Sequence, residues 1–306
     1  MIFEKLVPLI LILIFCVSPA RAADNTAQTQ NDSDQQVQDF TLSGYADKGK
    51  RNWDIKGKSA DISAQSIKLN NITSNFYGES DNVTLTADTG DYNRIAGKMH
   101  LEKNVVVTIS SGAKMTTNSL DWDKQNKTIS TEDKVKIEKE NVVTTGKGVF
   151  SRPELNQASL TKDVSVDILP LPGESSKGKG FGKVVITCDG PLQIDYHKKT
   201  ATFNKNVKVV TKDMVIHSDI MDVYFSSSDK KDLPKKLENI AEGSMFMGSQ
   251  IDKIRAWGNV KIVRGSNVSY SDEAIYNSVD NKIILSGRPK LEIASVEDFQ
   301  GALTGN

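Results

Sequence analysis

The sequence is poor in the residues on which disulfide-stabilised domains, metal sites and nucleic-acid binders depend. Among 306 residues there are two cysteines, three histidines and eight prolines, and 39 basic side chains are balanced by 39 acidic ones. A neutral chain without a run of Lys or Arg lacks the basic face that displaces counterions from nucleic acid. The composition therefore argues against a general nucleic-acid binder and describes a folded chain of about two domains.

Long hydrophobic runs are also missing, apart from one at the N-terminus. An apolar run from Leu6 to Val17 is followed by Ala20-Arg21-Ala22. The run is shorter than the roughly 20 residues that a membrane-spanning helix needs, and a small-x-small tripeptide is typical of a cleavage site. We therefore expect a secretory signal peptide over residues 1–22. An uncleaved membrane anchor is the competing interpretation, whereas lipoprotein processing at Cys16 is disfavoured by the bulky Phe15 before it.

The sequence shows no catalytic constellation. His100, His197 and His217 are far apart, and none has the spacing of metal ligands. Removal of the leader leaves Cys188 as the single cysteine, which has no evident catalytic partner and cannot form an intramolecular disulfide. The glycines of KGKGFGK lack the preceding strand and the following helix of a phosphate-binding loop. We therefore expect neither enzyme activity nor a cofactor or metal.

What the chain does contain is a repeated motif. Its clear copies are GKMHLEKNVVVT, NQASLTKDVSVD, KTATFNKNVKVV and DKIRAWGNVKIV, and fainter ones are KTISTEDKVKI and KIILSGRPKLEI. The residue after the central pair, which we call the marker, recurs at steps of 30, 29, 43, 53 and 29 residues. A unit of about thirty residues is therefore reused, with insertions at two places. The marker residues are Val105, Val135, Val164, Val207, Val260 and Pro289.

Each clear copy has the pattern of a strand that is interrupted once. Apolar and polar residues alternate on both sides of the central pair, which is the period of a strand with one buried face. The pair is Lys-Asn, Lys-Asp, Gly-Asn or Gly-Arg. Since Asn, Asp and Gly tolerate positive φ, the pattern predicts a tight turn or bulge at each pair. No long amphipathic helix pattern is present, so the chain is predicted to be all-β, with repeated antiparallel strands.

Polar segments indicate the domain boundaries. Residues 171–183, LPGESSKGKGFGK, are expected to be a linker, and a second polar stretch at about 226–250 is expected to be an insertion. The predicted order is a signal peptide at 1–22, a disordered polar tether at 23–38, β domains at 39–170 and 184–295, and a tail at 296–306.

Two long stretches resemble a known family. The segment from Phe40 to Glu79, with Trp53 and Gly57, and the later Leu120–Trp122 strand are similar to the periplasmic domain of LptC, a component of the lipopolysaccharide export machine. Downstream, AWGNV at 256–260, Ala274–Tyr276 and Leu285–Gly287 resemble the OstA/LptA domain. The order of these motifs over residues 39–295 makes the match specific. The chain departs from LptC proteins in its cleavable-looking leader and its added second domain.

The resemblance implies two OstA-like β-jellyroll (β-taco) domains, each with an apolar groove. It implies a periplasmic carrier or bridge that shields the acyl chains of lipopolysaccharide. The implied partners are lipid A, the inner-membrane ABC transporter complex, other OstA-like jellyroll proteins joined by edge strands or head-to-tail self-association, and the outer-membrane translocon. We expect the groove to be lined by Phe76, Leu85, Val105, Val107, Trp122, Ile129 and Ile137 in the first domain and by Val207, Val209, Val260, Ile262, Tyr276 and Ile283 in the second, with plain core packing as the competing account of each.

Three other functions are compatible with the residues. A structural β-solenoid of the cell envelope would show the same repeats around a filled interior. A polysaccharide-acting enzyme would need carboxylates clustered on one face. A scaffold that recruits transporter subunits would bind partners and no lipid. Neither the lipid, the oligomer length nor the domain that faces each membrane follows from the sequence.

Overall fold

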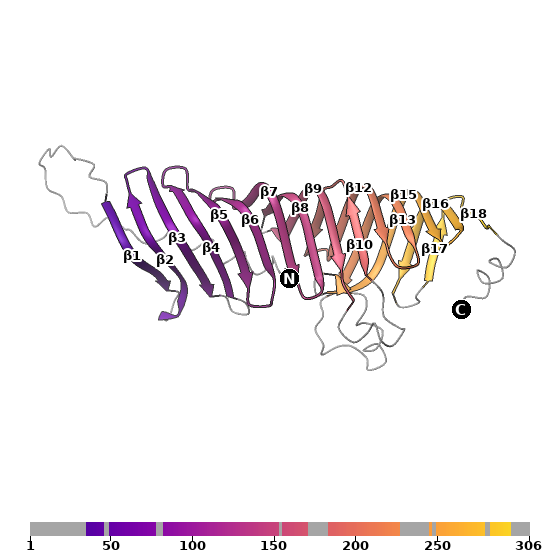
Figure 1. The fold of residues 1–306 in the computed structure, drawn as a ribbon, viewed down its shortest axis with the longest axis horizontal. Helices are drawn as coiled ribbons and strands as arrows, with labels where there is room; N and C mark the ends of the chain where they lie inside the picture. Colours follow the sequence, from indigo (N-terminus) through magenta and orange to yellow (C-terminus); the bar gives the residue numbers. More distant parts are fainter. Residues whose placement is uncertain are drawn as a thin grey trace, which may run out of the picture. The chain divides into compact units, whose positions relative to one another are not determined.

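In the described part of the computed structural model all eighteen elements are β-strands, which confirms the all-β prediction (Figure 1). The structure describes residues 35–45, 49–77, 82–152, 155–170, 183–226, 245–246, 249–278 and 282–294. No helix in this part of the chain is long and apolar enough to cross a membrane. The expected leader and tail, and most of the expected tether, linker and insertion, lie outside the described residues.

The chain divides into two compact units, of residues 1–133 with 150–156 and of residues 134–149 with 157–306. Unit 1 contains β1 to β6, the first half of β7 and the end of β8, and unit 2 contains the remaining strands. The strands are β1 (Gln35–Tyr45), β2 (Arg51–Ile62), β3 (Ser66–Tyr77), β4 (Asn82–Asn93), β5 (Lys98–Ile109), β6 (Lys114–Asp123), β7 (Thr128–Lys139), β8 (Val142–Arg152), β9 (Gln157–Ile168), β10 (Val184–Cys188), β11 (Leu192–Asp195), β12 (Thr200–Val210), β13 (Val215–Ser226), β14 (Met245–Phe246), β15 (Ser249–Arg264), β16 (Asn267–Asn277), β17 (Lys282–Ser286) and β18 (Lys290–Glu292).

In unit 1 the strands β1 to β6 pair with their neighbours in chain order, and every pairing is antiparallel. Short connections join them, so a strand and the next one form a hairpin. Along each strand buried side chains alternate with outward ones, as in β5, where Leu101 is buried and His100 and Glu102 are exposed. One face of the sheet therefore carries the core of unit 1, and we call it the inner face.

Unit 2 continues the same construction with two split strands. β10 and β11 both pair with β9 on one side and with β12 on the other. From β12 the order runs through β13 and β15 to β16, and β16 pairs with both β17 and β18. The two-residue strand β14 pairs with the start of β15. All these pairings are antiparallel, and the inner face again carries the buried residues.

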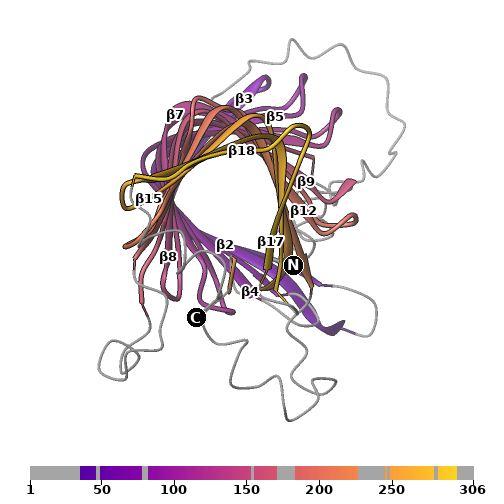
Figure 2. The same ribbon diagram turned by 90° about the vertical axis from the view of Figure 1, so that its right-hand side faces the viewer.

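The structure confirms a bulge at three of the predicted pairs. Lys103-Asn104, Lys205-Asn206 and Gly258-Asn259 have φ values between 49° and 76° at both residues. At each pair two residues face one residue of a neighbouring strand, which is the register of a β-bulge. Asp163 in β9 and the pair Gly287-Arg288 between β17 and β18 also have positive φ. At the three bulges the strand continues with increased bending rather than reversing, and Figure 2 shows the long strands as curved ribbons.

A side-chain hydrogen bond to an aspartate holds each of these bulges in place. The side-chain amide of Asn104 donates to Asp88 Oδ2 at 2.7 Å, and that of Asn259 donates to Asp219 Oδ2 at 2.8 Å. Asn206 makes the same contact with Asp189. Asparagine is therefore favoured at these positions both because it tolerates the left-handed conformation and because its amide reaches an aspartate.

Candidate functional site

The inner face of unit 1 is a continuous apolar surface. Fourteen buried residues from β2 to β7 form one hydrophobic cluster, and Phe76, Val105 and Val107 belong to it with at most 7% of their surface exposed. Ile129 is also a member, whereas Leu85 and Trp122 are half-buried and pack against it. The structure thus brings six of the seven residues predicted for the first domain together on one face.

The inner face of unit 2 carries most of the other predicted residues. Val207, Val209, Val260 and Ile262 are all buried. Ile137, which the sequence pattern groups with the first domain, is buried in the part of β7 that belongs to unit 2. The predicted set omits several of the most deeply buried side chains, which alternate in the same way and could have been found by extending the period-two pattern along each strand. These are Val166, Leu192, Phe203, Met221 and Val223.

At the last strands of unit 2 the inner face becomes exposed. Tyr276 is half-buried and shares its face with Val223 through Ile254, since the three are successive Cα partners. Ile283 is the partner of Tyr276 on β17 and is 44% exposed. Burial raises the pKa of the Tyr276 hydroxyl. The apolar surface therefore continues past the core onto strands that no further described strand covers.

Unit 1 has the same feature at its first strand. Val37 and Leu42 of β1 are the Cα partners of Ala60 and Ile55, which are core residues. They point to the inner face, yet Val37 is 40% exposed and Leu42 is 56% exposed. In each unit the apolar inner face thus extends to a terminal strand, where its side chains are partly exposed.

Buried hydroxyl groups lie beside the marker residues. Thr117, Ser218 and Ser271 are the Cα partners of Val105, Val207 and Val260 respectively, and all three are less than 10% exposed. Within the described residues their hydroxyl oxygens have no hydrogen-bond partner. A buried polar atom without a partner costs stability, so its recurrence at equivalent positions of the repeat calls for a reason beyond core packing.

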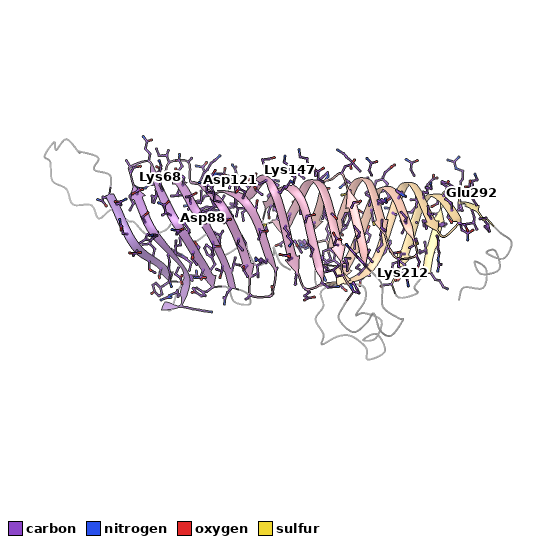
Figure 3. The ribbon with its side chains drawn as sticks, in the orientation of Figure 1. Lys68, Asp88, Asp121, Lys147, Lys212 and Glu292 are labelled. Carbon is purple, nitrogen blue, oxygen red and sulfur yellow. The ribbon has the colours of Figure 1, made fainter. Side chains whose placement is uncertain are left out.

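One row on the outer face of unit 1, which we call the ladder, alternates acidic side chains with a lysine and a histidine. Asp61, Lys68, Asp91, His100 and Asp121 are successive Cα partners from β2 to β6, and Lys68 and Asp121 are labelled in Figure 3. The ring Nδ1 of His100 lies 2.7 Å from Asp121 Oδ1. Opposite charges on neighbouring strands stabilise a sheet by a few tenths of a kcal/mol to about 1 kcal/mol per pair. The ladder thus gives His100 and Asp121 structural partners on the outer face.

Two polar networks on the outer faces also have structural explanations. Asp54 is 2% exposed; burial raises its pKa, but hydrogen bonds from Tyr77 at 2.6 Å and Asn75 at 2.9 Å outweigh this and lower the pKa overall. In unit 2, hydrogen bonds from Arg255 and then Ser286 lower the pKa of Glu273. These carboxylates are held in their ionised form by local donors, which is not the arrangement of a paired acid and base.

The other chemically notable features in the described part of the chain are a thiol and a surface pocket. No group of His, Cys, Asp and Glu residues there could hold a metal ion. Cys188 is buried on the inner face, and burial raises the pKa of its thiol, so it behaves as a small apolar side chain. A surface pocket of about 470 Å³ contains none of the predicted residues and is lined by Asn126, Lys127, Thr128, Phe150, Arg152 and Leu155.

Comparison with protein-family models gives two matches in the expected order. The model described as Lipopolysaccharide-assembly, LptC-related matches residues 6–168, which is more than half of the chain. The model described as LptA/(LptD N-terminal domain) LPS transport protein matches residues 190–305. None of the curated proteins compared matches the chain. The matches confirm the resemblance of the N-terminal part to LptC and of the C-terminal part to LptA.

Proposed function

The chain belongs to the LptC-related family of lipopolysaccharide assembly and takes part in lipopolysaccharide transport, and on this basis we propose that it is a periplasmic lipid carrier. In this proposal the inner faces of the two units shield the acyl chains of lipopolysaccharide, while the sugars stay in water. Both matched families are transport components rather than enzymes.

One observation carries the proposal: the apolar inner face remains exposed at the terminal strands. A protein with a purely structural core would gain by placing polar residues where the inner face meets water. Here the exposed positions are Val37 and Leu42 on β1 and Ile283 and Leu291 on the last strands. Such positions would let an acyl chain pass onto or off each unit without leaving an apolar surface.

The energetic need for such a surface is large. Each CH₂ group that leaves an apolar environment for water costs about 0.8 kcal/mol, so one long acyl chain costs on the order of 10 kcal/mol. A continuous apolar face removes most of this cost at every position along it. Because neighbouring positions are chemically alike, the lipid meets no large barrier between them. The direction of movement would come from the ATP-driven transporter of the export machine.

The buried hydroxyls fit the same function. Acyl chains of lipid A are attached through ester and amide groups, whose carbonyl oxygens accept hydrogen bonds. The hydroxyls of Thr117, Ser218 and Ser271 are donors within the apolar inner face. We assign them the role of binding these carbonyl groups, which would otherwise enter the apolar face without a partner.

Edge strands would join the carrier to its neighbours. β1 pairs with β2 on one side, and β18 pairs with β16 on one side. An edge strand has free backbone donors and acceptors to which a strand of another jellyroll can add. The predicted domains at 39–170 and 184–295 would in this way form a short bridge between the transporter complex and further jellyroll subunits.

Photo-crosslinking at a matched pair of tyrosines tests the carrier function. Tyr276 points to the inner face, and Tyr224 points to the outer face, because it lies between the inward residues Val223 and Phe225. The full chain is purified from a lipopolysaccharide-producing host with a photo-reactive phenylalanine analogue at either position. We expect lipid A adducts at Tyr276 and none at Tyr224. Equal adducts, or none at either position in a folded protein, would refute lipid carriage on the inner face.

A further inference from the structure

Three lysines that directly follow marker residues lie in one row on the outer face of unit 2, together with a histidine and a tyrosine from the strands between them. Lys208 of β12, His217 of β13, Lys261 of β15, Tyr270 of β16 and Lys290 of β18 are successive Cα partners. The strand neighbours of Lys208 and Lys261 on both sides are buried core residues, so these lysines point away from the core. We call these five residues the basic row.

The spacing of the lysines along the basic row is regular. Neighbouring strands lie about 4.8 Å apart, so lysines two strands apart are separated by about 10 Å. The Nζ atoms of Lys261 and Lys290 lie 5.8 and 5.9 Å from the ring centroid of Tyr270 between them. Lys290 also contacts Glu292 at 2.7 Å. In the described part of the chain no ion pair involves Lys208 or Lys261, so their charges are available to a partner.

An apolar row runs beside the basic row on the same face. Val185, Val210, Val215, Val263 and Val268 are successive Cα partners, two residues along the strands from the basic row where both rows share a strand. All five are half-buried. We call them the valine row. The outer face of unit 2 thus combines a line of cations with a line of branched apolar side chains.

The repeat allows a direct comparison with unit 1. The row that contains Val106, the residue after the marker of β5, consists of Lys56, Thr73, Thr86, Val106 and Thr116. It has one cation where the equivalent row of unit 2 has three lysines and a histidine. Both units are built from antiparallel strands that carry the same kind of bulge, so the strand geometry does not require the basic row.

The arrangement determines what kind of partner can bind. Three lysines spaced about 10 Å apart along one face can each contact a different anionic group of an extended partner. They match a surface on which anionic groups repeat, and the valine row and Tyr270 match a boundary between headgroups and apolar chains. We propose that the outer face of unit 2 docks on the surface of a bilayer that contains anionic phospholipid. This docking uses the face opposite to the carrier surface and does not depend on lipid carriage there.

Vesicle binding by a charge-matched pair of variants tests the docking surface. The full chain is mixed with vesicles of phosphatidylcholine plus phosphatidylglycerol, or of phosphatidylcholine alone, and the bound fraction is measured by co-sedimentation. Because a retained apolar leader would bind both kinds of vesicle, the ratio of the two partition coefficients is compared. The test variant is K208Q/K261Q/K290Q. The control variant, K56Q/K58Q/K114Q, removes the same charge from exposed positions of unit 1.

Each basic residue near an anionic leaflet contributes about fivefold to partitioning, so the test variant should reduce the ratio about a hundredfold. The control variant should leave it within about threefold. Circular dichroism establishes that both variants are folded. An equal loss in both variants would overturn the proposal in favour of non-specific attraction by net charge. A wild-type ratio near one would overturn it as well. Salt-sensitive retention of the wild type on immobilised polyglutamate, without preference for anionic vesicles, would assign the row to an acidic protein instead.

Discussion

The asparagine at a bulge should stabilise the fold through both its conformation and its side-chain hydrogen bond. Asn259 has a φ of 49°, and its amide donates to Asp219 Oδ2 at 2.8 Å. Alanine at this position would keep the left-handed conformation at a cost of about 1 kcal/mol relative to glycine or asparagine. Loss of an exposed hydrogen bond to a carboxylate costs about 0.5–1 kcal/mol more. We therefore expect Asn259→Ala to lower the free energy of unfolding by about 2 kcal/mol.

Asn259→Gly separates the two contributions. Glycine accepts the positive φ without strain and lacks only the amide, so the expected loss is about 0.5–1 kcal/mol. Urea unfolding followed by tryptophan fluorescence measures both variants, and a double-mutant cycle with Asp219→Ala isolates the hydrogen bond. Equal losses for the alanine and glycine variants would refute the conformational part of this reasoning. A coupling free energy of zero would refute the hydrogen-bond part.

Three further results are expected. Gly258→Ala should cost at least about 2 kcal/mol in urea unfolding, because φ is 76° and the added Cβ would lie 2.5 Å from Asp219 Oδ2; a neutral result would contradict the described bulge. The pKa of Asp123 is lowered to about 2, first by the backbone amide of Asn126. The ionised Asp123 therefore stabilises the folded protein fully above the unfolded pKa of 3.8, and this contribution is lost as the pH falls towards 2. Asp123→Asn should flatten the decline of the free energy of unfolding between these pH values. An unchanged decline would contradict the assignment. Cys188 should react with a thiol reagent only after unfolding, and rapid reaction of the native protein would show that the inner face opens there.

The sequence predicts the strands and bulges well because both depend on local patterns. Alternation sets the inner face, and a pair such as Lys205-Asn206 indicates the bulge at its centre. A single Asn or Gly within a strand does not indicate a bulge, because either residue is common there. The positive φ of Asn71 in β3 and of Gly148 in β8 was therefore not predicted.

Exposure and register could not be predicted because they depend on distant segments. Ile283 alternates like a core residue, but its exposure follows from its place on a strand with no described strand beyond it. The basic row combines Lys208, Lys261 and Lys290, which are far apart in the chain, and it appears only once the antiparallel register is known. The same holds for the buried hydroxyls, whose position opposite the markers is a property of strand pairing.

Native mass spectrometry of the exported protein tests lipid carriage most directly. The wild type, purified from a lipopolysaccharide-producing host, should carry a bound lipid whose fragmentation yields lipid A. A lysine on the half-buried inner face, as in Leu85→Lys with Tyr276→Lys, should remove this lipid, because an ammonium group would have to lie among acyl chains. The outward counterparts Thr84→Lys and Tyr224→Lys should retain it. A wild type without bound lipid, or inner-face variants that are folded and still loaded, would contradict the account.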